Sequence, residues 1–254
     1  MATATYALMG LLFGSFLTVV VDRVPRGASI ALPGSACGNC GLHLGPLDLV
    51  PVFSWLVLRG KCRRCRMSIG IEPLVLELST SLLFALMAWH FRATWRTAAF
   101  CALIAGLVAL SWIDLRTRRL PRQIIYATAL VGVPLLCVAA LAEGEPKRLW
   151  MLLAGAGISL AAMALIYWAS NGGMGDGDVR LAPLLGAYLG FLNPGLALVG
   201  LFFGFLAGAV VGVAVMVIVG GDRKMKVPFG PFMALGTVVA VFYGQDYIDL
   251  ILAR

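Results

Sequence analysis

GLALVGLFFGFLAGAVVGVAVMVIV, residues 195–219, contains no charged side chain. As a helix this stretch would rise about 37 Å, which exceeds the roughly 30 Å apolar core of a bilayer. The whole chain of 254 residues is 61% hydrophobic with a mean hydropathy of +0.94, too apolar for a single soluble core. We therefore expect an all-α, polytopic membrane bundle of about eight transmembrane helices. The other seven segments lie at about 4–22, 73–91, 97–114, 123–142, 149–169, 179–192 and 229–250.

Charged residues make up only 13% of the chain, yet the formal net charge is +8. Fifteen of the 20 basic residues fall in or beside alternate connections, including Arg223, Lys224 and Lys226 before the last segment. Lys and Arg concentrate in the cytoplasmic loops of membrane proteins, so this pattern predicts both termini outside and no nucleic-acid partner. No internal repeat and no linker between soluble domains is evident.

The loop of residues 23–72 is the one sizeable segment expected outside the membrane. It holds two CxxC pairs separated by 21 residues, made of Cys37, Cys40, Cys62 and Cys65. Two such pairs supply four thiolates for a tetrahedral zinc ion, and a cytoplasmic loop disfavours disulfides. We expect a small cytoplasmic zinc-binding loop domain, with redox-active or unmetallated thiols as the alternative. His43 is a possible substitute ligand, although an ordinary loop histidine is the simpler interpretation.

Cys101 and Cys137 fall near the outer ends of the third and fourth segments. They could form an extracytoplasmic disulfide or serve as small apolar residues in a helix interface. The second interpretation is favoured, because buried cysteines commonly behave as small hydrophobes.

The sequence GGMGDGDVRL, residues 172–181, places acids and glycines together at the expected edge of the membrane. Positions two apart on a helix point about 200° away from each other, so Asp176 and Asp178 cannot form one carboxylate pair. Asp176 suits a helix cap, whereas Asp178 would point into the bundle. Gly175 and Gly177 would leave room for a substrate backbone beside the acid.

Asp178 therefore needs a partner carboxylate from another helix at the same face. Asp114 is the best candidate, because it closes the third segment at a helix C-terminus, where the dipole disfavours an acid. Two carboxylates held together share one proton, so one can take a proton from water while the other gives one to a peptide carbonyl. This predicts an aspartyl protease site at the cytoplasmic membrane edge. The other acids expected near that face are Asp22, Glu72, Glu77 and Asp222.

The chain resembles the type IV prepilin leader peptidases, which are GxGD-type aspartic proteases of bacterial membranes. Residues 175–178 match GxGD, and Asp114, seven residues before Pro121, matches the family's other catalytic aspartate. Further matches are the four cysteines, Gly14-Ser15-Phe16-Leu17, Pro51-Val52-Phe53-Ser54-Trp55 and Pro228-Phe229-Gly230-Pro231-Phe232.

The resemblance implies an endopeptidase of the bacterial cytoplasmic membrane that cuts leaders from prepilins or pseudopilins after a glycine. It further implies methylation of the new N-terminus with S-adenosylmethionine, in an N-terminal region of residues 1–95, and a peptidase domain of residues 96–254. Glu77 is the candidate residue for methyl transfer. A proton-coupled transporter with a regulatory zinc loop is the alternative, but transporters of that kind often show repeated halves, which are not evident here. A scaffold for pilus assembly is a further alternative.

Overall fold

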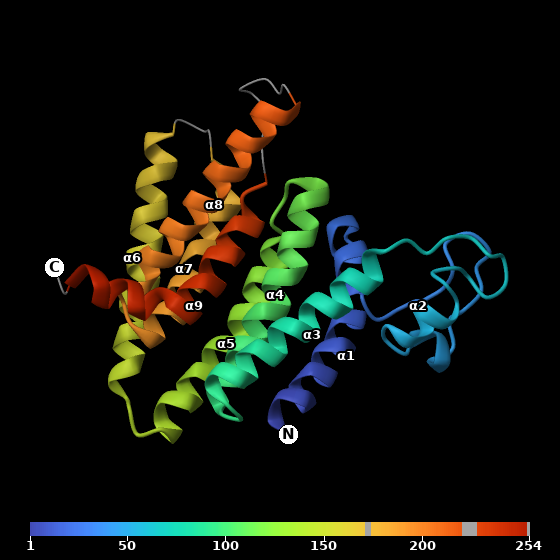
Figure 1. Cartoon of the computed structure of the whole chain (residues 1–254), viewed down its shortest axis with the longest axis horizontal. Helices are drawn as coiled ribbons and strands as arrows, with labels where there is room; N and C mark the ends of the chain where they lie inside the picture. Colours follow the sequence, from blue (N-terminus) through green and yellow to red (C-terminus); the bar gives the residue numbers. More distant parts are fainter. Residues whose placement is uncertain (171–173, 220–227, 253–254) are drawn as a thin grey trace. The chain divides into compact units, whose positions relative to one another are not determined.

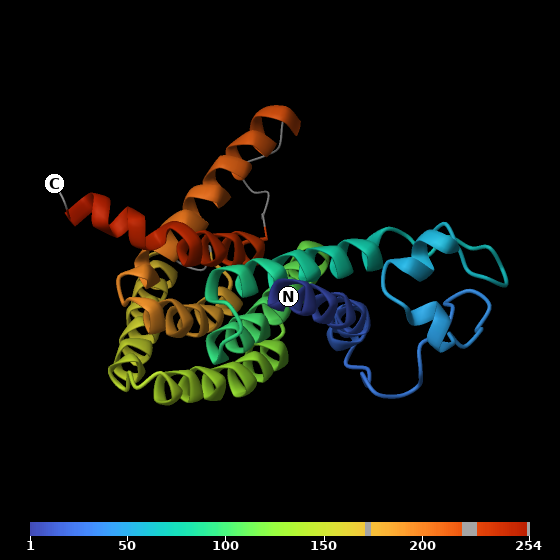
Figure 2. The same ribbon diagram turned by 60° about the horizontal axis from the view of Figure 1, so that its bottom comes forward.

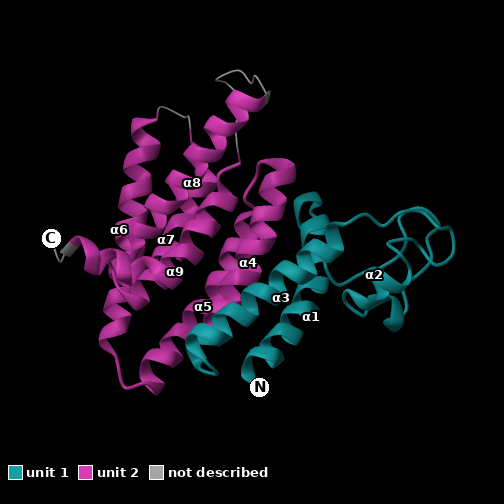
Figure 3. Cartoon of the chain, viewed as in Figure 1, with its two compact units in different colours: residues 1–97 teal, residues 98–254 magenta. Residues whose placement is uncertain are grey.

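The computed structural model describes residues 1–170, 174–219 and 228–252. Within these residues the secondary structure is helical apart from two isolated β-bridges, which confirms the all-α prediction. The chain divides into two compact units, Met1–Thr97 and Ala98–Arg254 (Figure 3). The residues Gly172, Gly173, Asp222, Arg223, Lys224 and Lys226, on which part of the sequence argument rests, lie outside the described ranges.

Unit 1 is built on two long helices, α1 (Ala2–Arg23) and α3 (Glu72–Phe91), which lie side by side (Figures 1 and 2). Two glycines of α1 allow this close approach: a Cβ at Gly14 would lie 2.5 Å from the Cα of Glu77, and one at Gly10 would lie 2.6 Å from the Cα of Ser81. The Ser81 hydroxyl also donates to the carbonyl of Ala7 at 2.9 Å. Backbone contact thus fixes the register of the pair.

Residues 27–71, here called the cysteine loop, connect these helices after the short η1 (Val24–Arg26). The loop contains η2 (Pro46–Leu49) and the five-residue α2 (Phe53–Val57). Side chains give it much of its order: Arg63 pairs with Asp48 at 2.8 Å, and the Trp55 indole N–H donates to the Gly70 carbonyl at 2.8 Å.

In the part of unit 2 that the structure describes, most of α4 is followed by five further helices. Helix α7 lies among its neighbours and buries almost every residue from Leu181 to Phe191 (Figures 1 and 2). Gly186 and Gly190 of α7 meet Gly155 at backbone distance, which brings α6 and α7 together closely. The helices are α4 (Trp95–Thr117), α5 (Arg122–Ala142), α6 (Lys147–Ala169), α7 (Asp176–Leu192), α8 (Leu196–Val219) and α9 (Gly230–Leu252).

Six of the described helices are long and apolar enough to cross a membrane: α1, α3, α4, α5, α6 and α8. Helix α7 has 17 residues, and α9 carries Gln245, Asp246 and Asp249 in its last turns. The chain is therefore a multi-pass membrane bundle, and the expected count of eight spans stays a prediction.

Candidate active site and metal centre

Asp114 lies in the last turn of α4, and its side chain is buried, with only 5% of its surface exposed. Its Oδ2 accepts the backbone N–H of Gly230 at 2.8 Å. Gly230 is the first residue of α9, where backbone N–H groups have no acceptor within their own helix. The positive end of the α9 dipole thereby offsets the cost of placing a carboxylate at the C-terminal end of α4.

Asp178 lies in the first turn of α7, three residues after the N-cap residue Gly175. It is 8% exposed, and its carboxylate accepts the backbone N–H of Gly175. A side chain that reaches back to the N-cap amide satisfies one orphan donor of the helix and places negative charge at the positive end of its dipole. Both buried aspartates are thus held at helix N-termini.

The structure brings these two aspartates together. Their carboxylates lie close enough for a direct Coulombic interaction. Leu120, in the connection between α4 and α5, packs against the helix starts that support both aspartates. It lies against Gly177 of α7 and against Gly230 of α9. In Figure 1 the end of α4 and the start of α9 both lie toward the top of the picture. The two acids that were expected to act together therefore come from different helices, α4 and α7, and whether they form a catalytic pair stays a prediction.

The glycines around the site are closely packed, and two of them, Gly177 and Gly230, leave no room for a Cβ unless a neighbour shifts. A Cβ at Gly177 would lie 2.9 Å from the Cβ of Leu120, and one at Gly230 would lie 2.9 Å from Oδ2 of Asp114. A Cβ at Gly175 would lie 3.3 Å from Oδ2 of Asp178. Gly175 and Gly177 were expected to make room for a substrate backbone. In the structure they also pack closely against residues of the protein itself, Gly175 against Asp178 and Gly177 against Leu120. Gly230 lies in one of the motifs that resemble the family, but no role was predicted for it. Its contact with Asp114 can be seen only in the folded chain.

The expected role of Asp176 as a helix cap is wrong. The N-cap of α7 is Gly175, so Asp176 is the first helical residue and its side chain caps nothing. It is exposed and pairs instead with Arg180 at 2.7 Å, one turn further along the helix. The physical reason is that a glycine with extended backbone serves as the N-cap and leaves the aspartate free for an i, i+4 ion pair.

The four cysteines of the loop form one cluster, with all four Sγ atoms within 4.8 Å of one another. Cys37 and Cys65 are 3.7 Å apart, and Cys40 and Cys62 are 3.9 Å apart. Four thiolates at about 2.3 Å from a tetrahedral zinc ion are separated by about 3.8 Å. The cluster could therefore bind a metal ion. His43 is exposed and does not belong to this group of ligand atoms.

The two CxxC turns repeat one another 25 residues apart, which corrects the expectation that the chain has no internal repeat. In the first, the Cys37 N–H donates to Leu42 and a bridge joins Ala36 to His43; in the second, the Cys62 N–H donates to Met67 and a bridge joins Lys61 to Ser68. The repeat was missed because the aligned sequences CGNCGLHLG and CRRCRMSIG share only the two cysteines and a final glycine.

Backbone amides prepare two of these sulfurs to act as thiolates. The backbone N–H groups of Cys40 and Asn39 hold the pKa of the Cys37 thiol below its ordinary value. The backbone N–H of Met67 and a hydrogen bond with Asn39 lower the pKa of Cys65 to about 6. The thiolate is the form that binds metal, so this geometry favours a ligand role.

Glu77 is buried in the second turn of α3 and contacts two other parts of unit 1. Its Oε2 accepts the backbone N–H of Val52 at 2.7 Å, and the Ser15 hydroxyl is a second hydrogen-bond partner. Val52 has a φ of 60°, which is unfavourable for a β-branched residue. The carboxylate therefore helps to hold the strained backbone at Val52 of the cysteine loop against α1 and α3.

Cys101 and Cys137 both carry free thiols, and Cys101 is buried in α4. The disulfide interpretation therefore finds no support in this structure, and Cys101 packs as a small apolar side chain.

Two family models match the chain. The Bacterial Peptidase A24 N-terminal domain matches residues 8–91, and the Type IV leader peptidase family matches residues 101–217. Relatives named prepilin leader peptidase/N-methyltransferase match nearly the whole chain. The one from Pseudomonas aeruginosa is 32% identical over 94% of this chain and 89% of its own length. The one from Bacillus subtilis is 30% identical over 95% of this chain and 94% of its own length. No solved structure matches.

Proposed function

The chain belongs to the type IV leader peptidase family, and on that premise we propose that Asp114 and Asp178 are the catalytic pair with which it cleaves prepilin leader peptides. The observation that carries this proposal is the convergence of two buried carboxylates from α4 and α7, each supported by a backbone N–H at a helix start. The comparisons give no support to the alternative of a proton-coupled transporter.

The chemistry follows from two carboxyl groups that share one proton. The ionised carboxylate takes a proton from a water molecule, whose oxygen attacks the scissile carbonyl carbon. The protonated carboxyl gives its proton to the carbonyl oxygen, so that no full negative charge develops there. When the tetrahedral intermediate collapses, one of its hydroxyl groups gives its proton to the ionised carboxylate, the carbon–nitrogen bond breaks, and the leaving amine takes the proton of the other, protonated carboxyl. The two aspartates then return to their starting protonation.

The substrate is proposed to be a prepilin or pseudopilin whose short leader is cut after a glycine. The concentration of basic residues in alternate connections supports a cytoplasmic position for the cysteine loop and the aspartates. The leader would then meet the enzyme at the cytoplasmic face of the bacterial inner membrane, while the apolar helix of the substrate stays in lipid.

Cys37, Cys40, Cys62 and Cys65 are proposed to hold one zinc ion. The sulfur separations suit zinc, and four protein ligands leave no open position for a substrate or water, so the role is structural. A bound zinc ion would cross-link the two CxxC turns. Neither CxxC segment, taken by itself, is part of a helix or a strand.

The second activity in the names of the relatives is N-methylation, and we place it in the N-terminal region of residues 1–95, ahead of a peptidase domain of residues 96–254. S-adenosylmethionine is the proposed methyl donor. Glu77 supports this assignment as a buried carboxylate outside the peptidase pair.

Cleavage of a co-expressed pilin, followed as a gel shift, tests the peptidase proposal. Asp114→Asn and Asp178→Asn should each abolish the shift, because each removes an acid or a base. Asp176→Asn is the matched control on the same helix turn and should cleave at close to the wild-type rate. Full cleavage by either of the first two variants, at equal protein level, would refute the assignment of the pair.

A further inference from the structure

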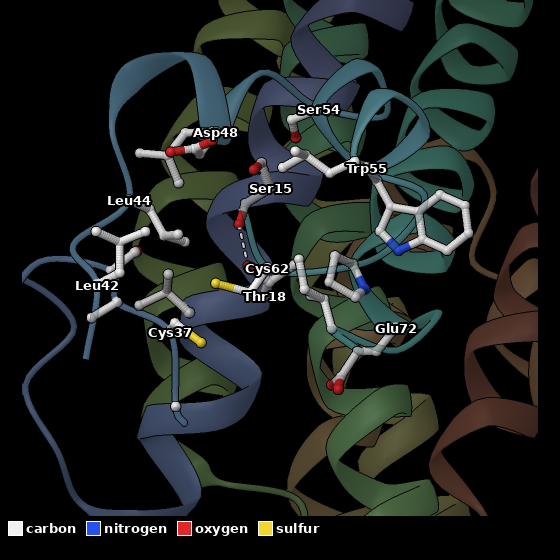
Figure 4. Close-up of a pocket in the computed structure, with 18 of the residues that line it drawn as sticks. Ser15, Thr18, Cys37, Leu42, Leu44, Asp48, Ser54, Trp55, Cys62 and Glu72 are labelled. Atoms are coloured by element: carbon white, nitrogen blue, oxygen red, sulfur yellow. Dashed lines mark hydrogen bonds between the residues drawn. The ribbon is translucent and has the colours of Figure 1, made fainter. Parts of the chain in front are cut away.

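Unit 1 contains a cavity of about 580 Å³ that the peptidase proposal does not use. Its lining comes from α1, from both CxxC turns, from α2 and from the start of α3, and Figure 4 shows these side chains around it. Cavities of about 300–1,000 Å³ are the usual size for small-molecule sites. Every residue that lines it belongs to unit 1, whereas Asp114 and Asp178 belong to unit 2.

The lining combines one large aromatic ring with small polar groups. Trp55 is held in place by its hydrogen bond to the Gly70 carbonyl and by close packing on Gly60. A ring fixed in this way offers a flat surface on which a purine can stack. Ser15, Thr18 and Ser54 add hydroxyl groups to the same cavity (Figure 4).

The lining carries four carboxylates, among them Glu72 and Glu77, and two guanidinium groups, Arg23 and Arg63, so its excess of negative charge favours a cationic ligand. Asp48 and Asp22 are already paired, with Arg63 and Arg26 respectively. Glu77 is 5% exposed, and the partners the structure gives it, the Val52 N–H and the Ser15 hydroxyl, are both neutral. A buried carboxylate is costly unless an opposite charge accompanies it. A ligand with positive charge near Glu77 would supply that charge.

We propose that this cavity binds the sulfonium methyl donor, with the Glu77 carboxylate facing the donor's positive charge and Trp55 beside its purine ring. The inference rests on the proposed methylation activity and gives it a location. When bound, the donor supplies a methyl group: its carbon–sulfur bond breaks as the amine nitrogen of the cleaved substrate forms the carbon–nitrogen bond, the sulfur leaves as a neutral thioether, and the nitrogen loses a proton to water. Glu77 holds the donor by its negative charge, and the hydrogen bond from the Val52 N–H keeps that carboxylate in position.

Equilibrium dialysis of the purified full-length protein with labelled S-adenosylmethionine, and separately with S-adenosylhomocysteine, tests the proposal. Glu77→Gln keeps an oxygen that can accept the Val52 N–H but removes the charge, so donor binding should weaken about 10- to 100-fold. Ser54→Leu, which adds bulk inside the cavity, should abolish binding of both molecules. Thr5→Leu, on the exposed side of α1, is the matched control and should bind as the wild type does.

Leader cleavage and metal content are measured on the same samples as controls for folding. A loss confined to S-adenosylmethionine would place Glu77 at the sulfonium, and an equal loss of both molecules would place it at the amino group; either result supports the site. Wild-type donor binding by both Glu77→Gln and Ser54→Leu would overturn it. If the wild-type protein cleaves the leader but neither binds the donor nor methylates, the proposed methylation itself fails, which is a distinguishable result.

Discussion

Replacing Gly230 by alanine tests the arrangement of the peptidase site most directly. The added Cβ would lie 2.9 Å from Oδ2 of Asp114, which is closer than real Cβ contacts allow, and 3.0 Å from Cδ2 of Leu120, which is tighter than most such contacts. The start of α9 or the Asp114 carboxylate must therefore shift, and the 2.8 Å hydrogen bond between them must lengthen. A hydrogen bond to a charged group contributes about 1.5–3 kcal/mol, which corresponds to a rate loss of roughly 10- to 100-fold if the bond acts in the transition state.

The assay is the steady-state cleavage of a prepilin in detergent or membranes, with rates referred to the amount of folded enzyme. We expect kcat to fall while KM stays near its wild-type value, because Gly230 supports a reacting group and does not act in ground-state binding. Gly212→Ala in α8 is the matched control, because a Cβ there meets nothing within 4 Å. Wild-type kcat in folded Gly230→Ala enzyme would refute the view that the α9 amide supports Asp114 during catalysis.

Three other outcomes are expected. The double variant Asp114→Asn with Asp178→Asn should cleave hardly more slowly than either single variant, because residues that act as one unit are non-additive; multiplied losses, measured by the same assay, would contradict a shared function. Replacing Cys62 and Cys65 together by serine should remove the zinc from purified protein, and elemental analysis that still finds about one zinc per chain would exclude the four-cysteine site. A single cysteine introduced at Arg118 should resist membrane-impermeant thiol reagents in intact cells, and labelling there would reverse the proposed orientation.

Most helices of this chain could be predicted because apolar length is a strong local signal. The segment expected at 123–142 is Arg122–Ala142 in the structure, and the one expected at 4–22 is Ala2–Arg23. Helix α7 begins at Asp176, three residues before the expected start at 179, because the hydropathy of the segment begins only after the two aspartates. A capping glycine at 175 starts the helix earlier than its apolar residues indicate.

The site was predictable only in part. Asp114 and Asp178 stand out in sequence because each is an acid next to an apolar run. The Gly230 amide does not, because its contact with Asp114 joins residues 116 positions apart and depends on how α9 begins. The role of Asp176 was wrong for a related reason: whether an aspartate caps a helix or pairs with Arg180 depends on the backbone of the residue before it.

The structure also explains why an acid can stand at the end of α4. A carboxylate there faces the negative end of its own helix dipole and the charge of Asp178, and both effects oppose burial of Asp114. Two helix starts offset this cost, since α9 presents its first amide to Asp114 and α7 presents the amide of Gly175 to Asp178. Because α7 and α9 start separately, a shift of either helix would change the backbone N–H support of one aspartate and leave that of the other unchanged. In the proposed mechanism the relative position of these two helix starts would therefore set how the pair shares its proton, and the close packing of Leu120 against Gly177 and Gly230 holds that position.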